Sequence, residues 1–258
     1  MPNTKDISLA MVSYHNAEDI IPAIESIEEH TDAEIQKQIL IIDNADEPEL
    51  FRGLVEKYDD VTYVNPGENI GYARGNNYII DQLDSRYHVI ANPDIMFTED
   101  SLKKIIQYMD DTVGIGMVIP KIIGQDGELL PIYRKELTLF DLFTRRYLKG
   151  LFKSRIAKHT LSDQDYSEPF QVPFGQGSFL VIRTDLFRQL NGFDENYFLY
   201  VEDADLCKRV NRYSKLIYYP DTTVMHKWKR GSATDRDLLK AHIKSVNYYF
   251  KKWGVKLF

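Results

Sequence analysis

"ISLAMVSY" at residues 7–14 decides the fold class, because it is an almost continuous apolar run. Strands buried on both faces of a parallel sheet have this pattern, whereas half-exposed strands alternate apolar and polar residues. Three further strand-like runs follow: QILIIDNA (38–45), VTYVN (61–65) and YHVIANPD (87–94). Helix-like segments lie among them: PELFRGLVEKY (48–58), RGNNYIIDQL (74–83) and SLKKIIQYM (101–109). This alternation predicts an α/β fold with a mostly parallel central sheet and right-handed crossovers.

Composition restricts the class of protein. A chain of 258 residues fits one large α/β domain or two small ones, and 43% hydrophobic residues predict a packed core. The formal net charge of −7 argues against a nucleic-acid partner, which requires a basic face. The single cysteine, Cys207, excludes an intrachain disulfide and favours a cytoplasmic location.

Membrane association is predicted only at the periphery. The first ten residues, MPNTKDISLA, lack the basic and apolar regions of a signal peptide, and no window has the 18 apolar residues of a membrane span. Residues 137–159 and 247–258, however, mix basic and aromatic side chains. Such segments occur as surface helices or loops, and also as patches for an anionic membrane surface on the inner face of the cell membrane. The pattern leaves both interpretations open.

Polar residues follow two of the predicted strands. Asp43 ends the second strand and Asp94 follows the fourth, so both are expected at the carboxyl edge of the sheet, where α/β proteins bind ligands. A strand-end aspartate can also be only a turn former or a helix cap. Asn16 is placed to cap the helix that follows the first strand.

The segment NPGENIGYARGNN (65–77) is rich in glycine but has neither the G-x-G-x-x-G spacing nor a phosphate-binding P-loop. This disfavours an NAD-linked oxidoreductase. The glycines fit either a turn of small residues or a close approach of the backbone to a ligand, with Arg74 placed to meet a phosphate.

The motif FDENYFLYVEDADLCKRV (193–210) contains a group of acids after its aromatic residues. Glu202, Asp203 and Asp205 are expected in the first turn of a helix, where unpaired N–H groups favour acids. The helix start explains one or two of them. A carboxylate that stays ionised there could also act as a general base toward an acceptor hydroxyl. The aromatic residues before it suit either a substrate platform or a core.

The motifs together, in order and spacing, resemble family 2 glycosyltransferases, and most closely the bacterial rhamnosyltransferases that decorate surface polysaccharides. The resemblance covers residues 7 to about 250 and rests on these stretches: MVSYHN, IIDNAD, ENIGYARGNN, ANPDI, GQGSFLVIR, GFDENYFLYVEDADLCKRV and PDTTVMHKWKRGSA. Each motif alone is weak, but the ordered set is specific.

The resemblance implies a GT-A fold over residues 1–258 as a single domain. Residues 1–120 would form the half that binds the nucleotide sugar. Residues 121–258 would form the half that carries the catalytic base, a basic-aromatic insertion at 137–168 and a C-terminal helical segment on the acceptor side.

The resemblance also assigns roles to individual residues. Asp203 is implied as the catalytic base, with Glu202 orienting it or touching the acceptor. Asp94, beside Asn92, is implied as a ligand of Mg²⁺ or Mn²⁺, with His226 as another metal or diphosphate contact. The remaining contacts with the nucleotide sugar are implied at Ser13, Tyr14, Asn16, Asp43, Asn69, Gly71, Arg74, Gly75 and Asn76.

One departure from the family pattern and one open interpretation affect these roles. Asn92 stands where a D-x-D motif has its first acid, so one metal ligand is missing and metal dependence is expected to be weak. His226 fits a packed or capping residue as well as a ligand.

The activity implied is inverting transfer of L-rhamnose from dTDP-β-L-rhamnose to a saccharide or lipid-linked saccharide acceptor. Two alternatives stay open. One is a hexosyl- or galactofuranosyltransferase that uses a UDP-sugar. The other is a non-catalytic module that only binds a nucleotide sugar. The oligomeric state is not predicted.

Overall fold

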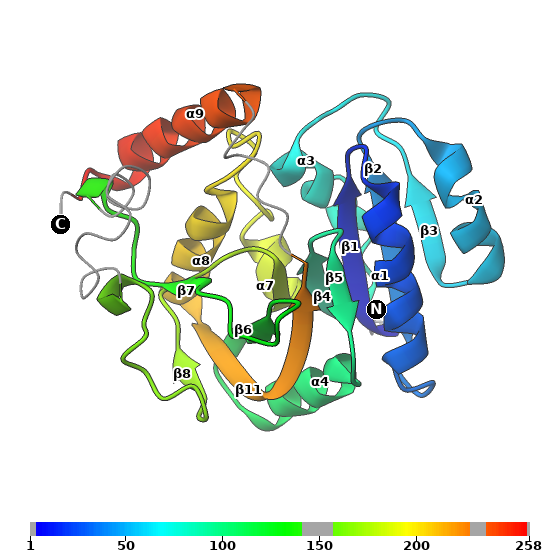
Figure 1. The fold of residues 1–258 in the computed structure, drawn as a ribbon, viewed down its shortest axis with the longest axis horizontal. Helices are drawn as coiled ribbons and strands as arrows, with labels where there is room; N and C mark the ends of the chain where they lie inside the picture. The colour runs from blue at the N-terminus through cyan, green and yellow to red at the C-terminus, as the bar shows by residue number, and fades with distance from the viewer. Residues whose placement is uncertain (1–3, 141–156, 228–235, 257–258) are drawn as a thin grey trace.

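The computed structural model describes residues 4–140, 157–227 and 236–256. A nine-stranded sheet runs through it in the order β3-β2-β1-β4-β10-β6-β11-β5, with β8 paired to β11. Helices α1 and α2 lie beside the first strands, and α8 and α9 lie at the opposite side of the molecule (Figure 1).

The first four strands confirm the predicted parallel sheet. Their bounds are β1 Lys5–Ser13, β2 Lys37–Asp43, β3 Val61–Val64 and β4 Ser85–Ala91, and they pair in parallel as β3-β2-β1-β4. The helices that connect and follow them are α1 Ala17–His30, α2 Pro48–Lys57, α3 Tyr72–Asn77 and α4 Ser101–Asp111. β1 is buried from Ile7 to Ser13, as expected for a strand covered on both faces.

The second half of the chain completes the same sheet. β10, Phe179–Arg183, lies antiparallel between β4 and β6, Ile115–Ile123. β11, Lys215–His226, runs parallel to β6 and antiparallel to the short strand β5, Ile95–Phe97. A strand from each half of the chain therefore lies between strands of the other half.

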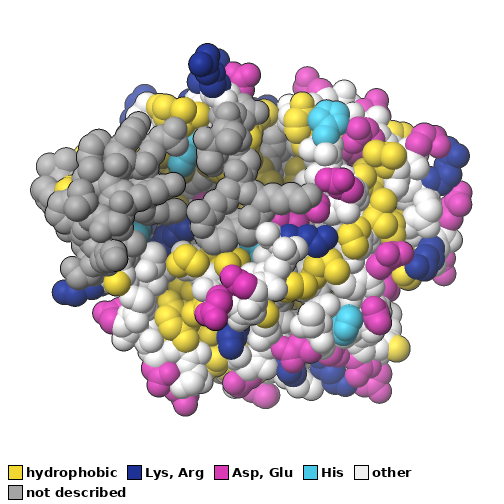
Figure 2. Space-filling model, in the orientation of Figure 1, with side chains coloured by type: hydrophobic (Ala, Val, Ile, Leu, Met, Phe, Trp, Pro, Cys, Tyr) yellow, Lys and Arg dark blue, Asp and Glu magenta, His cyan; other side chains and the backbone are white. Residues whose placement is uncertain are grey.

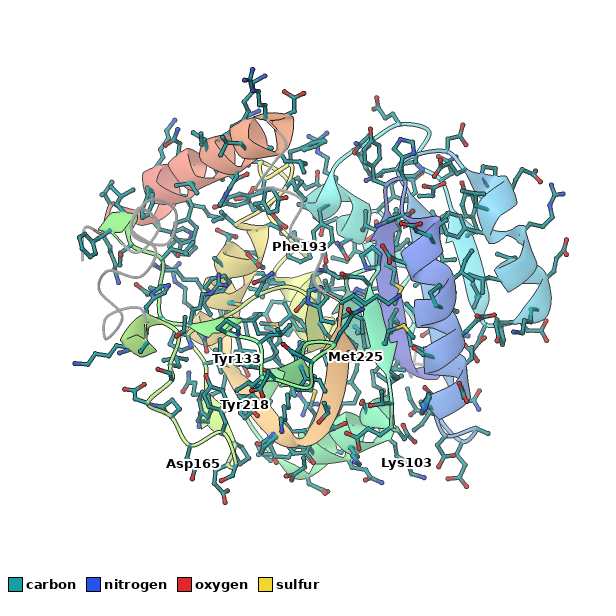
Figure 3. The ribbon with its side chains drawn as sticks, in the orientation of Figure 1. Lys103, Tyr133, Asp165, Phe193, Tyr218 and Met225 are labelled. Atoms are coloured by element: carbon teal, nitrogen blue, oxygen red, sulfur yellow. The ribbon has the colours of Figure 1, made fainter. Side chains whose placement is uncertain are left out.

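A loop held over the sheet carries residues 175–178. β6 leads into a hairpin, with Leu130 N donating to Ile122 O at 2.9 Å and Gly127 at a φ of 80°. The chain continues through three short strands: β7 Tyr133–Arg134, β8 Phe170–Gln171 and β9 Phe174–Gly175. Tyr133 and Tyr218 pack edge to face at 4.8 Å, and the buried Tyr133 hydroxyl bonds Ile122 N and Pro120 O (Figure 3). This aromatic cluster supports β7 and β9, and with them the loop.

Two local predictions are wrong. The helix expected over 74–83 ends at Asn77, and a single 3₁₀ turn, Ile80–Gln82, follows. The Asn77 side chain instead bonds the backbone of Phe193, accepting at 2.8 Å and donating at 2.9 Å. Asn16 stands at the N-cap of α1, but its side chain makes no cap, because it accepts from the Ser13 hydroxyl instead.

The remaining helices are α7 Thr184–Gln189, α8 Glu202–Tyr213 and α9 Arg236–Trp253. Tyr249 and Phe250 of α9 are buried, so part of the aromatic tail belongs to the core. Acidic and basic side chains are interspersed over the described part of the face in Figure 2. Within the described residues, no helix is both long and apolar enough to cross a bilayer. Most of the basic-aromatic segment, residues 141–156, lies outside the described residues, and its membrane interpretation stays a prediction.

Candidate active site

The carboxyl ends of β1, β2 and β4 meet at one edge of the sheet, as predicted for Asp43 and Asp94. At the end of β1, the Ser13 hydroxyl donates to Asn16 Oδ1 at 2.9 Å, and Tyr14 N donates to the same atom at 3.1 Å. This leaves the Tyr14 side chain 53% exposed, with its ring 4.5 Å from that of His15. His15 has a φ of 54° and bonds Glu47 Oε1 at 3.0 Å. The edge therefore presents an exposed aromatic face beside an acid.

Asp43 organises the loop after β2 from a fully buried position. Its carboxylate accepts from Ala45 N at 3.0 Å, Glu47 N at 2.6 Å and the Tyr63 hydroxyl at 2.9 Å. Burial and the Asp43 carboxylate raise the pKa of Tyr63 and keep that hydroxyl a donor. With three donors already bound, Asp43 fixes the loop that holds Glu47.

The glycine-rich segment docks on the backbone just before α8. Gly71 has a φ of 83°, and a Cβ there would lie 2.5 Å from Phe198 O, so only glycine fits. Asn69 Oδ1 accepts from Gly71 N at 3.0 Å, and Tyr72 N donates to Phe198 O at 2.8 Å. Gly75 lies against Val12 of β1. The segment therefore links the carboxyl edge of the sheet to the start of α8.

Arg74 and Asn76 lie on α3 but point in different directions. Arg74 pairs with Glu195 at 3.6 Å, and both side chains are more than half exposed. The predicted phosphate contact of Arg74 would require it to leave this weak surface pair. Asn76 is buried and donates to Tyr72 O at 3.0 Å.

The Tyr72 hydroxyl joins the two sides of the site, a role that sequence reasoning missed. It lies 3.3 Å from both Asn92 Oδ1 and Gly177 O and can donate to either. Burial, then the charges of Glu202 and Asp203, raise the pKa of Tyr72 and keep the hydroxyl protonated. One buried donor thus connects the Asn92–Asp94 segment with the loop that contacts Asp203.

Asp94 and His226 come together from distant parts of the chain. Antiparallel pairing of β5 with β11 places His226 opposite Ile95, and His226 Nε2 lies 3.0 Å from Asp94 Oδ1. Both side chains are largely buried, and His226 Nδ1 has no hydrogen-bond partner among the described residues.

These two groups fit a divalent cation that also binds a diphosphate. A carboxylate oxygen and an imidazole nitrogen suit Mn²⁺, and Mg²⁺ is commonly held by one or two carboxylates plus substrate phosphates. The described residues contain no cluster of three metal-ligating side chains, so a cation here would depend on donor oxygens and water.

Asp203 faces the site from the first turn of α8. Tyr200 and Val201, just before the helix, have φ values of 68° and 72°, a strained conformation for a β-branched residue. Asp203 Oδ2 accepts from Gly177 N at 2.9 Å, and Oδ1 accepts from Ala204 N at 2.8 Å. Two backbone donors therefore fix the carboxylate.

Glu202 and Asp203 differ in how easily they ionise. Burial raises the pKa of both groups. The Glu202 pKa is raised further by the neighbouring Asp203 charge, and its Oε2 has no partner among the described residues. For Asp203, the N–H donors of Gly177 and Ala204 and the charge of Arg134 partly offset burial. Asp203 therefore ionises first, beside a neutral Glu202, although burial opposes the easy ionisation expected at a helix start.

The other acids of this motif are structural. Asp205 is fully buried and accepts from Arg209 Nε at 2.7 Å and Trp253 Nε1 at 2.8 Å. Lys252 lies 2.7 Å from both Asp205 and Asp194. Burial opposes ionisation of Asp194, but Lys252 and the donors of Asn196 outweigh it and lower the pKa of Asp194 to about 2. These two acids attach α9 to α8.

Several buried polar atoms around the site have no partner in the part of the chain that the structure describes. They belong to Asn44, Ser178, Glu47, Asn76, Glu202 and His226. The first two contact the site directly, since Asn44 Nδ2 donates to Gly71 O at 3.2 Å and Ser178 O accepts from Asn92 N at 2.8 Å. Buried polar groups are normally paired, so this concentration is typical of a site that binds polar ligands. The motif GQGSFLVIR was the available signal for Gly177 and Ser178.

The fold is that of GT-A glycosyltransferases. A solved structure of GalNAc-T7 with UDP, GalNAc and Mn²⁺ shares this fold, with a TM-score of 0.70 at 12% identity over 96% of this chain and 48% of that one. Residues 8–190 match the family model "Glycosyl transferase family 2". The chain belongs to that family.

Two curated relatives are rhamnosyltransferases. The N-acetylglucosaminyl-diphospho-decaprenol L-rhamnosyltransferase of Mycobacterium tuberculosis is 30% identical over 225 residues, covering 81% of this chain and 72% of the relative. The rhamnosyltransferase WbbL of Escherichia coli is 25% identical over 189 residues, covering 70% of this chain and 69% of the relative. The suspected resemblance to rhamnosyltransferases of this family is thereby confirmed.

Proposed function

We propose that this glycosyltransferase transfers L-rhamnose from dTDP-β-L-rhamnose, with inversion, to a saccharide linked to a lipid through diphosphate. The observation that carries the proposal is the Asp203 carboxylate, which two N–H donors fix and which lies, like Asp94, close enough to Tyr72 for its charge to raise the pKa of that hydroxyl. The two rhamnosyltransferase relatives support the choice of sugar and acceptor. The protein would act in the cytoplasm, where surface saccharides are built on lipid carriers.

Asp203 and the pair of Asp94 and His226 have separate tasks in the reaction. Asp203 removes the proton from the acceptor hydroxyl, and the new bond forms at C1 on the face opposite the leaving diphosphate. One base and one displacement invert the configuration, through a transition state with oxocarbenium character. Asp94 and His226 would hold a divalent cation, which neutralises charge on the leaving diphosphate when bound. Glu202, as a neutral acid, can donate to an acceptor oxygen without repelling it.

Calorimetric titration with dTDP, UDP and GDP, each with and without Mn²⁺, tests the donor. The expected result is tightest binding of dTDP, enhanced by Mn²⁺. Preference for UDP would keep the transferase but replace rhamnose by a hexose or galactofuranose. Failure of all three nucleotides would favour a non-catalytic protein.

The Asp94→Asn variant is expected to bind dTDP with little or no enhancement by Mn²⁺. Loss of a residue that only hydrogen-bonds to a metal ligand costs about 10- to 100-fold in metal affinity. Loss of the ligand itself should therefore cost at least about tenfold. Calorimetry in the presence and absence of Mn²⁺ measures the difference. Asp126→Asn, at the exposed hairpin turn, is the control and should behave as wild type. If Mn²⁺ still enhances dTDP binding fully in Asp94→Asn, Asp94 is not a ligand of the cation.

The acid limb of kcat/KM is expected above the ordinary aspartate pKa of 3.8, because burial raises the pKa of Asp203. Activity should fall as pH decreases through that raised pKa, since the base must be ionised. Glu202→Gln should leave this limb in place, because glutamine copies the neutral acid. A pH–rate profile of both proteins measures it. Strong loss of activity in Glu202→Gln at every pH would mean that Glu202 acts as an anion.

Glu202→Gln has a further expected effect, on stability. The folded state keeps a proton on Glu202 that the unfolded chain releases above the ordinary glutamate pKa of 4.5, so stability decreases as pH rises beyond that value. The variant should therefore gain stability relative to wild type at pH 8 and not at pH 4. Melting temperatures at the two pH values measure the gain.

A further inference from the structure

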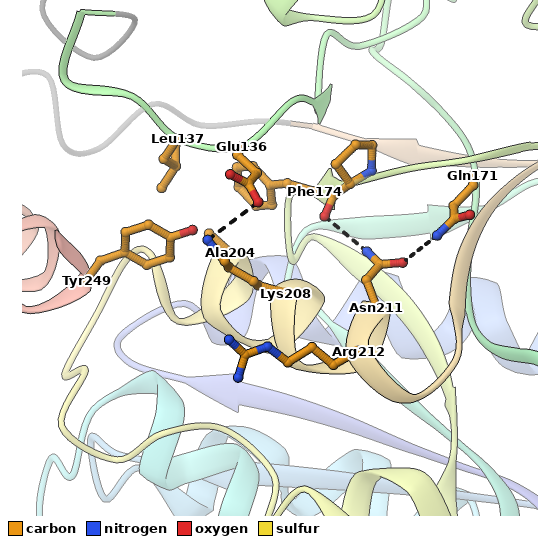
Figure 4. A pocket seen from close by; sticks show the side chains of 10 residues that line it. Glu136, Leu137, Gln171, Phe174, Ala204, Lys208, Asn211, Arg212 and Tyr249 are labelled. Atoms are coloured by element: carbon orange, nitrogen blue, oxygen red, sulfur yellow. Dashed lines mark hydrogen bonds and ion pairs between the residues drawn. The ribbon is translucent and has the colours of Figure 1, made fainter. Parts of the chain in front are cut away.

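A cavity of about 460 Å³ opens along α8 on a helix face next to the one that carries Asp203 (Figure 4). Ala204, Lys208, Asn211 and Arg212 form one stripe of the helix and line it. The opposite walls come from the segments around β7, β8 and β9 and from α9: Glu136, Leu137, Gln171, Pro173, Phe174 and Tyr249. No role in the proposed reaction has been assigned to this cavity.

The polar groups of the cavity divide into those already used and those that can still bind a ligand. Asn211 accepts from Gln171 Nε2 at 3.1 Å and donates to Val172 O and Pro173 O, each at 3.1 Å, so its amide holds the wall together. Glu136 binds two lysines, Lys208 at 3.4 Å and Lys256, and the Lys256 hydrogen bond lowers the pKa of Glu136. The polar atoms of Asn211 and Glu136 are therefore already engaged within the protein and are poorly placed to bind a ligand.

The remaining groups are cationic and aromatic. Arg212 stacks on Trp253, with the guanidinium 4.4 Å from the ring centroid, and no described carboxylate lies within ion-pair distance of it. Lys208 Nζ lies 4.8 Å from the same ring centroid. The lining has two cations, Lys208 and Arg212, against one carboxylate, Glu136, which Lys208 shares with Lys256 from outside the lining, in a chain with a net charge of −7. A positive excess over apolar walls suits a phosphate attached to an apolar or sugar group.

The place of the cavity relates it to the acceptor. Ala204 follows Asp203 directly, and Lys208 lies one helical turn further, a rise of about 6 Å. Arg212 lies a second turn beyond, in the direction away from Asp203. An acceptor whose hydroxyl meets Asp203 would reach Lys208 with a group roughly one sugar ring away. The positive charge of Lys208 and its distance from Asp203 both match an acceptor sugar whose phosphate lies about one ring away from the reacting hydroxyl.

We propose that Lys208 and Arg212 bind the phosphate or diphosphate of the acceptor, and that the enzyme thereby selects saccharides linked to a phosphate carrier over free ones. This rests on the proposed function. The partner is the acceptor itself, and the apolar walls formed by Leu137, Phe174 and Tyr249 receive the first part of its carrier chain.

Two acceptors that differ only in phosphate test the proposal. One is N-acetylglucosamine joined through diphosphate to a decyl chain, and the other is the decyl glycoside of the same sugar. Lys208→Gln and Arg212→Gln should each raise KM for the diphosphate acceptor about 10- to 100-fold, the usual effect of losing a charge-assisted hydrogen bond. KM for the neutral glycoside and the Kd of dTDP should not change. Equal effects on both acceptors, or no effect, would overturn the proposal.

Control variants separate charge from folding. Lys251→Gln removes an exposed lysine of α9 and should leave both KM values at wild type. Lys208→Arg should restore most of the affinity lost in Lys208→Gln, and all variants should melt within a few degrees of wild type. If Lys208→Gln does not fold, Arg212→Gln carries the test, because Arg212 is exposed.

Failure of the proposed function would be distinguishable. If wild type transfers no sugar, titration of the diphosphate compound alone still reports on the cavity, and weaker binding by both variants supports the proposal. No binding by wild type overturns it. Vesicles containing phosphatidylglycerol provide the last comparison. Loss of vesicle binding in the variants at unchanged acceptor KM would assign the cavity to a membrane headgroup and reject the acceptor.

Discussion

Replacing Asp203 by asparagine is expected to lower kcat by about 10²- to 10⁴-fold, the usual contribution of a positioned general base. The protein should fold, because the single amide oxygen of asparagine can still accept from one of the two N–H donors, Gly177 N or Ala204 N. Its stability near neutral pH should change little, because the loss of the other bond is offset by removal of a charge that burial penalises. Product formation at saturating donor and acceptor measures kcat, and the Kd of dTDP should stay at the wild-type value.

The result contradicts the mechanism if kcat of Asp203→Asn stays within tenfold of wild type. The acceptor would then lose its proton to another group or to water. An unchanged kcat together with weaker acceptor binding would make Asp203 a binding residue. Analysis of the product by NMR spectroscopy establishes whether the configuration at C1 is inverted, which one base of this kind requires.

The same substitution two residues later is expected to have the opposite profile. Asp205→Asn should lower the free energy of unfolding by about 3–5 kcal/mol, because it removes a buried charge that neutralises buried cations. Arg209 would lose its carboxylate partner at 2.7 Å, and Lys252 would keep only Asp194. Urea denaturation measures the loss, and hydrogen exchange should show faster opening of α9 than of β1.

Asp203→Asn and Asp205→Asn act as controls for each other. Both replace an acid in the first turn of α8 by its amide. One should remove activity at full stability, and the other should reduce stability while the folded fraction binds dTDP normally. A small stability change in Asp205→Asn would mean that α9 is attached mainly by Tyr249 and Phe250, which are buried without charges.

The fold was largely predictable where a single physical pattern decides. β1, β2 and β4 are apolar runs buried over most of their length, and β3 is a partly exposed edge strand; all four appeared in the predicted order. β11 was not recognised as a strand, because Pro220 and Asp221 interrupt its pattern at a shift in its pairing with β6. The three-residue strand β5 is too short to show any periodicity. The helix over 74–83 failed because a tertiary contact, Asn77 with Phe193, outweighed local propensity.

The charged residues of the site could be predicted from the sequence, but the uncharged residues that hold them in place could be predicted only in part. Asp94, His226, Glu202 and Asp203 were named from the family resemblance. The fold brings the three acids close enough to Tyr72 to raise its pKa, and His226 lies beside Asp94. Tyr72 was missed because a tyrosine beside glycines shows no sign in sequence of reaching Asn92 and Gly177. Asp43 was expected to contact the nucleotide sugar, a role that stays a prediction. Its buried carboxylate already binds three donors, which only the folded loop reveals.

The position of β10 between β4 and β6 limits how this enzyme could be divided. The two halves of the chain are not modules joined by a linker, because each supplies a strand that the other needs as a neighbour. A chain cut after β6 would leave an open edge on β4, and the His226 that faces Asp94 would be on the other fragment. Domain shuffling is therefore a poor route to new specificities here. Changes of acceptor are better sought within the loops and the cavity along α8, which the continuous sheet leaves free to vary.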